Sequence, residues 1–527
     1  MRKVGFFCVF SVILSIILLP SRKAYAADMT DIRVGLEALY KNKSTIMIYN
    51  SEIALGFCIG NAYEQEIELY SAAGFGFNPD KGTYYVSRNN YASYNEAVSV
   101  CNEIAAGGAV AYPAYAGRNS WKVYVTAASY NAFSTGKMKA YSSDYVKQVS
   151  SAYLIKVTGQ DLVLLIDGER AGGFPQIKAL KKTDGILSVN LGSRSYRGRI
   201  EIGRYGGAST VTAVNIINIE SYLLGVITCE MNHTWPEEAL KAQAVCSRSF
   251  AYMRSRFGAD SNLKTAYSMG DTTASQVYKG VTGETTEGTD AVKATIGQIV
   301  LSKGKPIDAF FFSTSGGATD SIMDIWGISS SSYAGVFDVF ETDPEKKPWV
   351  VDFSVNEASE RLSSAGYNVG KVISIEPEIL TESGRIYRAR IKGTSKTLTI
   401  TGSKLKSIFG LSDTKCRVIT SNSTADTVTV IGADDTKRIR LMECYAISDN
   451  GTEKLSGNVS QYIVISSDNY YNIPRVLPDE GILRFIGMGW GHGVGMSQSG
   501  AKGMAEKGYD YRQIIAYYYN NAEVGGY

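Results

Sequence analysis

The stretch that decides the fold is residues 215–252, NIINIESYLLGVITCEMNHTWPEEALKAQAVCSRSFAY. An apolar run within it ends at one carboxylate, Glu230, and a short polar link leads into a helix built mostly from small residues. A carboxylate at the rim of an apolar segment loses part of its hydration, which raises its pKa toward the range that suits a general acid near neutral pH. Small residues on all sides of a helix predict close packing, so we expect Arg248 to be buried against an anion.

A second stretch, residues 487–501, reads GMGWGHGVGMSQSGA. Glycines at this density let a backbone approach a ligand closely. We expect His492, one of only 2 histidines in the chain, to reach a ligand from this loop, the alternative being a histidine that stabilises the loop. Ser497 and Gln498 open a predicted helix, where they either face a substrate or cap the helix.

Composition bounds the class of protein. A chain of 527 residues predicts two to four domains. The net charge of +3, without a long basic run, excludes an argument for nucleic-acid binding. The 35 tyrosines are typical of a β-rich exported protein with half-buried strands, and aromatic faces that bind sugar rings are the alternative.

The N-terminus, residues 1–26, has the pattern of a secretory signal. Arg2 and Lys3 precede an apolar core at residues 6–20, which is shorter than the ~20 residues that a spanning helix needs. Residues 24–26, Ala-Tyr-Ala, form a small-residue cleavage site. Arg22 and Lys23 are atypical before such a site, so the segment is either cleaved or kept as an anchor, which would be the chain's membrane contact. In both cases we expect an exported, extracytoplasmic protein at the cell wall or the outer face of the cytoplasmic membrane.

The remaining pattern predicts an α+β fold that is rich in strands. Alternating apolar residues separated by glycine turns dominate, and helices are few. We divide the chain into N-terminal strands, a small β-α-β insert, a core that holds Glu230, a strand-rich continuation, and a glycine loop followed by a helix. Their bounds are residues 27–80, 81–135, 150–345, 346–480 and 481–527.

Both quoted stretches resemble the SpoIID/LytB family, which comprises stage II sporulation protein D and amidase-enhancer proteins. The family pattern reads roughly Y-L-x-G-V-x-x-E-M-P-x-x-W-P-x-E-A-L-K-A-Q-A-V-A-A-R-T-Y-A, and later G-x-G-H-G-V-G-M-S-Q-Y-G-A. Asn232 stands here where the family usually has proline, and Ser499 where it has tyrosine. Residues 271–278, DTTASQVY, resemble a third segment, D-T-T-x-x-Q-V-Y. The resemblance covers residues 155–527 and the strand at residues 32–36.

The resemblance implies a β-rich, multi-part domain with a few helices around a glycan cleft. It implies action on the glycan strands of peptidoglycan, and in sporulation members lytic transglycosylase chemistry with Glu230 as acid and base. It places His492 in the active cleft, where it would bind substrate or orient Glu230. The predicted substrate-binding residues are Arg248, Gln276, Tyr278, Ser497 and Gln498. A structural ion pair is the alternative for Arg248, and a core position is the alternative for Tyr278.

Residues 81–135 resemble a SPOR domain, a small β-α-β unit that binds glycan strands stripped of their peptides. The pattern has apolar residues at helical spacing in residues 95–104, glycines at Gly107 and Gly108, and alternating strands on either side. The alternative is a generic α+β insertion.

Sporulation members of the family carry a Cys/His cluster that binds zinc around the D-T-T-x-x-Q segment. Here that segment is flanked by neither residue type: MGDTTASQ occupies residues 269–276. Structural zinc sites need four ligands, almost always Cys or His. We therefore expect no metal and no other cofactor.

Two functions remain open on the sequence. The first is an exported peptidoglycan lytic transglycosylase that uses Glu230. The second is a non-catalytic wall-binding protein that stimulates a partner N-acetylmuramoyl-L-alanine amidase. Both predict binding to glycan strands, either intact or free of peptides, and they differ in whether Glu230 performs chemistry.

Overall fold

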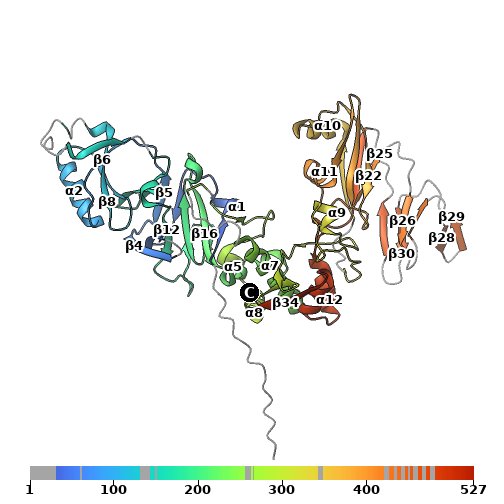
Figure 1. Ribbon diagram of the computed structural model, residues 1–527. Helices are drawn as coiled ribbons and strands as arrows, with labels where there is room; N and C mark the ends of the chain where they lie inside the picture. The colour runs from blue at the N-terminus through green and yellow to red at the C-terminus, as the bar shows by residue number, and fades with distance from the viewer. Residues whose placement is uncertain are drawn as a thin grey trace, which may run out of the picture.

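The computed structural model describes residues 31–59, 62–130, 134, 143–148, 151–255, 263–264, 266–341, 348–420 and 481–526, with short strands between residues 427 and 474. The predicted signal at residues 1–26 lies outside the described residues. Within them, no helix is both long enough and apolar enough to cross a bilayer. The architecture is mixed α and β and rich in strands, which confirms the predicted fold class (Figure 1).

The first sheet joins the N-terminal strands to the strands that precede Glu230. Its neighbours are antiparallel except for the parallel pair β1–β17. Its order is β17 (Met269–Gly270), β1 (Asp31–Gly35), β16 (Thr212–Asn218), β15 (Arg199–Gly203), β12 (Gln176–Ala179), β3 (Glu52–Ile59) and β4 (Ala62–Tyr70). Strand β16 lies next to β1 and leads directly into the helices of the site.

A second sheet holds the other N-terminal strands. Its order is β2 (Ile46–Ile48), β5 (Phe75–Pro79), β10 (Leu154–Thr158), β11 (Val163–Asp167), β7 (Ala111–Tyr115), β8 (Trp121–Thr126), β6 (Tyr84–Ser87) and β9 (Tyr145–Gln148). The predicted 27–80 segment is therefore divided between two sheets, because β1, β3 and β4 belong to the first and β2 and β5 to the second.

The predicted insert at residues 81–135 contributes β6, β7 and β8 to the second sheet. Helix α2 (Tyr94–Ala106) connects β6 to β7, Ser93 caps it by accepting from the Glu96 N–H at 3.2 Å, and it ends at Gly107 as predicted. The strand order β7-β8-β6-β9 is that of a split β-α-β unit. The unit extends beyond the predicted end at residue 135, because β9 pairs with β6. It is also continuous with its surroundings, because β7 pairs with β11.

The central region packs helices against the first sheet. It contains α5 (Ile219–Leu224), α6 (Ile227–Glu230), α7 (Glu237–Ser255), α8 (Thr286–Ala294), α12 (Gln498–Glu506) and α13 (Tyr511–Tyr518). Helix α7 contacts the other five, and most of its residues are buried. Figure 1 labels α5, α7, α8 and α12 in this central region. Small residues let its neighbours approach from several sides, as the sequence predicts. A small sheet of β19 (Lys305–Pro306), β18 (Gln298–Ser302) and β34 (Ala522–Gly526) lies beside it.

A second core lies in the part drawn orange in Figure 1. Two three-stranded sheets form it, with helices α10 (Val355–Ser364) and α11 (Gly402–Phe409). Their orders are β21 (Trp349–Ser354), β32 (Ile482–Gly487), β25 (Cys416–Thr420), and β22 (Val372–Leu380), β23 (Ile386–Gly393), β24 (Thr397–Thr401). The predicted boundary at residue 480 cuts this unit, because β32 pairs with both β21 and β25.

Short elements complete the described chain. Three strand pairs follow β25, formed by β26 (Thr427–Ile431), β27 (Thr436–Arg440), β28 (Tyr445–Ser448), β29 (Gly451–Lys454), β30 (Gln461–Ile465) and β31 (Tyr470–Pro474). The others are α1 (Glu37–Tyr40), α4 (Gly168–Ala171), α9 (Ile322–Trp326), β13 (Val189–Asn190), β14 (Ser195–Tyr196), β20 (Phe311–Phe312) and β33 (Met496–Ser497), with 3-10 turns at Ala127–Ser129, Tyr205–Gly207 and Gly280–Gly283. The parallel pair β20–β33 matters for the site, because it fixes the start of α12.

Candidate active site

Glu230 ends a short helix that is anchored by apolar side chains. Tyr222, Leu223, Val226 and Ile227 are buried and fix α5 and α6 against the core. Gly225 joins the two helices, and a Cβ there would lie 2.5 Å from the Gly280 carbonyl oxygen, so only glycine fits. The chain leaves α6 in an extended conformation at Met231. Glu230 is thus held at the edge of the core, partly buried, as the sequence predicts.

The Glu230 carboxylate has two hydrogen-bond donors. The backbone N–H of Val277 donates to Oε1 at 2.5 Å, and the side-chain amide of Gln498 also donates to the carboxylate. Burial raises the pKa of Glu230 above its ordinary value, while these two hydrogen bonds oppose the rise. No neighbouring charge contributes to the shift among the described residues. The site therefore holds one carboxylate whose protonated form is favoured by desolvation.

Gln498 reaches Glu230 because the start of α12 is fixed. Ser497 belongs to β33 and caps α12 by accepting from the Gly500 N–H at 3.1 Å. The Gln498 amide also donates to Gln243 Oε1 at 3.3 Å, and Gln243 donates to the Ser247 hydroxyl at 2.9 Å. A line of amides thus connects α7 to the Glu230 carboxylate. Gln498 is the predicted substrate-binding residue that the structure brings to Glu230.

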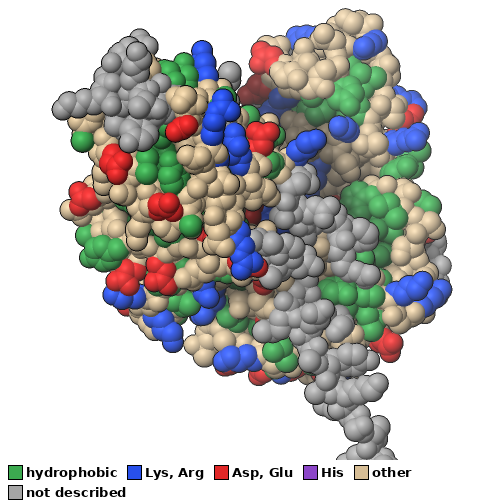
Figure 2. Space-filling view, turned by 60° about the vertical axis from the view of Figure 1, so that its left-hand side comes forward, with side chains coloured by type: hydrophobic (Ala, Val, Ile, Leu, Met, Phe, Trp, Pro, Cys, Tyr) green, Lys and Arg blue, Asp and Glu red, His purple; other side chains and the backbone are tan. Residues whose placement is uncertain are grey.

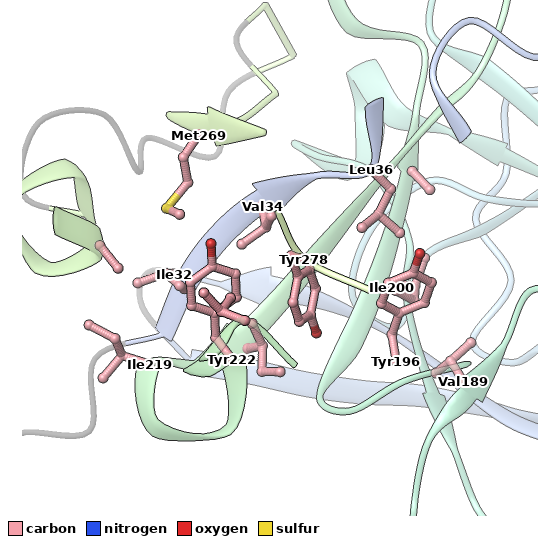
Figure 3. Close-up of a cluster of buried hydrophobic side chains, with 14 of the residues drawn as sticks. Ile32, Val34, Leu36, Val189, Tyr196, Ile200, Ile219, Tyr222, Met269 and Tyr278 are labelled. Atoms are coloured by element: carbon pink, nitrogen blue, oxygen red, sulfur yellow. The ribbon is translucent and has the colours of Figure 1, made fainter. Parts of the chain in front are cut away.

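Gln276 and Tyr278 lie on either side of the Val277 N–H, and both side chains point into the core. Gln276 is fully buried and accepts from the Tyr222 hydroxyl at 3.1 Å. Tyr278 is 1% exposed, donates to Asn215 Oδ1 at 2.8 Å, and packs on Tyr222 with ring centroids 4.8 Å apart. Figure 3 shows Tyr222 and Tyr278 in this cluster. The two predicted substrate-binding residues therefore position the Val277 N–H, and the structure supports the core alternative for Tyr278.

Arg248 is fully buried and is occupied by the protein itself. Its Nε and Nη2 donate to the two carboxylate oxygens of Glu220 at 2.8 and 2.7 Å. Nη1 donates to the Gln298 carbonyl at 3.0 Å. The geometry is a bidentate ion pair that joins α7, α5 and β18. These contacts support the structural alternative and leave no donor of Arg248 facing a substrate.

His492 packs among aromatic rings and bonds to the backbone. Its Nδ1 accepts from the Val494 N–H at 3.1 Å, and the ring also bonds to the Phe311 backbone. Its ring centroid lies 5.1 Å from that of Trp326 and 5.3 Å from that of Phe312. Burial, helped by nearby positive charges, lowers the pKa of His492 to about 3. These contacts support the loop-stabilising alternative, and none of the described contacts joins His492 to Glu230.

Ser497 is also fully buried. Its hydroxyl caps α12 and also bonds to the Asp338 carboxylate, which opposes the rise in the pKa of Asp338. Asp338 accepts from the Tyr518 hydroxyl at 2.9 Å, and burial raises its pKa. A Cβ at Gly500 would lie 2.4 Å from the Asp338 oxygens, which explains a glycine at this helical position. The capping alternative for Ser497 is thus supported.

The described residues contain no group of three or more His, Cys, Asp or Glu side chains arranged to hold a metal ion. Asp271, in the segment that resembles D-T-T-x-x-Q, accepts from the Ala38 N–H at 2.9 Å and lies 3.7 Å from Arg194. The Asp271 carboxylate is therefore engaged by the Ala38 N–H and the Arg194 guanidinium. The donor set does not fit the zinc site of the sporulation members.

The sequence analysis did not identify two groups of the site, the Val277 N–H that bonds to Glu230 and the Gln243 amide that bonds to Gln498. Val277 acts through its backbone N–H, which no side-chain pattern reveals. Gln243 lies in the first quoted stretch, among the small residues of a close-packed helix. A polar side chain in such a helix is expected to be buried and hydrogen-bonded, which is the argument that was applied to Arg248.

Residues 207–301 match the family described as Stage II sporulation protein. An uncharacterized protein of Brachyspira hyodysenteriae (strain ATCC 49526 / WA1) is 28% identical over 79% of this chain and 95% of its own length. The amidase enhancer of Bacillus subtilis (strain 168) is 26% identical over 64% of this chain and 45% of its own length. Stage II sporulation protein D of the same organism is 26% identical over 59% of this chain and 76% of its own length. These similarities support the SpoIID/LytB family.

Proposed function

We propose that the chain is an exported lytic transglycosylase that cleaves the MurNAc–GlcNAc bond of peptidoglycan, with Glu230 as acid and base. The observation that carries the proposal is the single, partly buried carboxylate at the end of α6, which has a raised pKa and an oxygen fixed by the Val277 N–H. The similarity to sporulation protein D of Bacillus subtilis supports a role at the cell wall.

The chemistry needs one carboxyl group. Protonated Glu230 donates its proton to the glycosidic oxygen as the bond to the MurNAc C1 breaks. The resulting carboxylate then takes the proton of the MurNAc C6 hydroxyl, whose oxygen bonds to C1 and closes the 1,6-anhydro ring. Neither a water nucleophile nor a second carboxylate is required, unlike the pair used by most glycoside hydrolases. Desolvation favours the protonated form that begins this cycle.

The surroundings of Glu230 suit both halves of the cycle. The Val277 N–H and the Gln498 amide stabilise the carboxylate that exists between the two proton transfers. Their opposition to the effect of burial moderates the rise in pKa, which suits a group that must both release and regain a proton in one cycle.

Glycan binding is the second element of the proposal. The split β-α-β unit formed by β6, α2, β7, β8 and β9 would bind strands that have lost their peptides, and its strand order and α2 support this part of the proposal. The glycan at Glu230 would then be one part of a longer bound strand.

The test is incubation of the purified protein with intact and amidase-treated glycan strands, followed by mass spectrometry for 1,6-anhydromuramyl ends. Glu230→Gln keeps the shape of the side chain but cannot transfer the proton, so the rate should fall by ~10²–10⁴. Glu287→Gln, which changes an exposed carboxylate at the start of α8, is the matched control and should cleave normally. Unchanged cleavage by Glu230→Gln would refute the mechanism.

A second candidate follows from the similarity to the amidase enhancer of Bacillus subtilis. In that case the chain binds the wall and stimulates a partner amidase, without chemistry of its own. Glu230→Gln would then leave amidase stimulation intact, and no anhydromuramyl product would form with either protein. Measuring the product and the stimulation on the same variant separates the two functions.

A further inference from the structure

Trp490 has an exposed side chain on a backbone that is fixed on both sides. The exposed fraction of the residue is 59%. Its N–H donates to the Thr314 carbonyl at 2.9 Å, and its carbonyl accepts from the Thr314 N–H at 3.1 Å. The Trp349 indole donates to the Gly489 carbonyl at 3.0 Å, and the Gly491 N–H donates to the Ser412 carbonyl at 3.0 Å. The loop therefore presents this indole in a defined place.

Other exposed apolar side chains lie on segments that meet this loop. Gly316 packs against Met488 and Gly489, and the neighbouring Ala318 pairs with Phe337. Trp326 lies against His492, two residues after Trp490. Exposed large apolar residues on these segments are Met323, Trp326, Phe337, Val339, Met488 and Trp490. Single exposed apolar residues are ordinary, but a group on adjoining segments is typical of a binding surface.

The same segments hold three buried polar atoms that have no hydrogen-bond partner among the described residues. They are Thr314 Oγ1, Asp338 Oδ2 and Ser499 Oγ. Thr314 pairs with Trp490 through both backbone hydrogen bonds, so Thr314 Oγ1 is the one of these atoms that lies beside the indole, whereas the Asp338 carboxylate lies against Tyr518 and Gly500. A buried polar atom without a partner is unfavourable, so Thr314 Oγ1 is suited to bonding a polar group of a ligand at Trp490.

We propose that Trp490 and Thr314 form a further saccharide subsite, on which one sugar ring of the glycan stacks. A pyranose has an apolar face of C–H groups, which fits the negative face of an indole, and a rim of hydroxyls, which fits polar atoms beside the ring. The ligand identity rests on the proposed function. The subsite itself rests on the fixed indole and on Thr314 Oγ1 next to it.

The subsite is close enough to Glu230 to share one strand. Eight residues connect Trp490 to Gln498, whose amide bonds to Glu230, and eight residues span at most ~28 Å. A strand of several sugar rings is long enough to cover this distance, whereas a disaccharide at Glu230 does not need Trp490. Figure 2 shows that one face of the molecule is hollowed, with Lys and Arg side chains at the border of the hollow.

The test measures binding by calorimetry in the Glu230→Gln background, which keeps the strands from being consumed. Peptide-free glycan oligosaccharides of increasing length are the probes. Trp490→Ala should weaken binding of the long oligosaccharides about tenfold or more and abolish the gain with length, and Trp490→Phe should retain part of it. Tyr70→Ala, which removes another exposed aromatic ring on strand β4, is the matched control and should bind like the parent.

Each result bears on one proposal. If Trp490→Ala binds long strands as tightly as the parent, the subsite does not exist. If binding depends on Trp490 but the wild-type protein releases no anhydromuramyl product, the subsite stands and the transglycosylase fails. If Trp490→Ala loses stimulation of an amidase with unchanged glycan affinity, the surface binds a protein and the subsite is refuted.

Discussion

Arg385 and Asp413 form an ion pair in which both residues are fully buried. Arg385 Nε lies 2.9 Å from Asp413 Oδ1, and Nη2 lies 3.2 Å from Oδ2. The remaining Nη1 donates to Asp320 Oδ2 at 3.0 Å and to the Ala318 carbonyl at 2.8 Å. A Cβ at Gly493 would lie 2.5 Å from Arg385 Nε. One guanidinium therefore joins the second core to the turn before α9 and to the glycine loop that leads to α12.

We expect Arg385→Ala to destabilise the protein by ~3–5 kcal/mol, because two buried carboxylates then lose their partner. Urea unfolding measures the loss. Arg390→Ala is the matched control, since Arg390 lies on β23, the strand that directly follows Arg385, but forms an exposed pair with Glu378 whose loss should hardly change the stability. Equal losses in the two variants would contradict the role assigned to Arg385.

Glu230→Gln should stabilise the fold in a pH-dependent way. Burial raises the pKa of Glu230 in the folded protein, so the folded state prefers the protonated carboxyl and loses stability as the pH rises through that pKa. The amide carries no charge and escapes this loss. We expect the two proteins to melt at similar temperatures below pH 4.5, the ordinary pKa of the group, and the variant to melt at a higher temperature at pH 7–8. A variant that is less stable at pH 8 than the wild type would show that Glu230 is stabilised as a carboxylate.

Local patterns predicted the elements that carry the site. The apolar run before Glu230, the small residues of α7 and the glycines before α12 each determine their own conformation, so their positions could be read from the sequence. The anion expected for Arg248 exists, but its identity, Glu220, depends on how α5 packs against α7. A residue's partner in space follows from tertiary packing, which a pattern along the chain does not specify.

The roles of the remaining site residues depended on burial. Gln276, Tyr278 and Ser497 were predicted to bind substrate, and the structure places all three inside the protein. A motif marks residues that matter, but it does not separate those that touch a ligand from those that hold a backbone group in place. Strand β9 was missed for a similar reason, because it joins its sheet through a non-local pairing with β6.

The chain should bind no stoichiometric zinc. The described residues offer no cluster of metal ligands, and Asp271 is engaged by the Ala38 N–H. Elemental analysis of protein purified without chelator should give far less than one metal per chain. A zinc ion that survives dialysis, and whose removal lowers the melting temperature, would overturn this expectation.

His492 should remain neutral throughout the working pH range, because burial holds its pKa at about 3. The pH profile of the cleavage rate should therefore have the same shape in the wild type and in a His492 variant. NMR spectra of histidine-labelled protein test this directly, and His233→Gln identifies the signals of the two rings. We expect the His492 signals to stay constant from pH 5 to pH 8. A His492 resonance that moves within this range would show that the ring gains a proton there and would contradict this prediction.

Gln498→Leu should shift the pH dependence of cleavage toward alkaline pH. The Gln498 amide donates to the Glu230 carboxylate and lowers its pKa, so its loss lets burial raise that pKa further. In the proposed mechanism cleavage begins with protonated Glu230, so the alkaline limb of the cleavage rate should move to higher pH, even if the maximal rate falls. Gln65→Leu, an exposed change on strand β4, is the control and should leave the limb in place. A limb that moves to lower pH in Gln498→Leu, or does not move at all, would mean that Gln498 does not set the protonation of the catalytic acid.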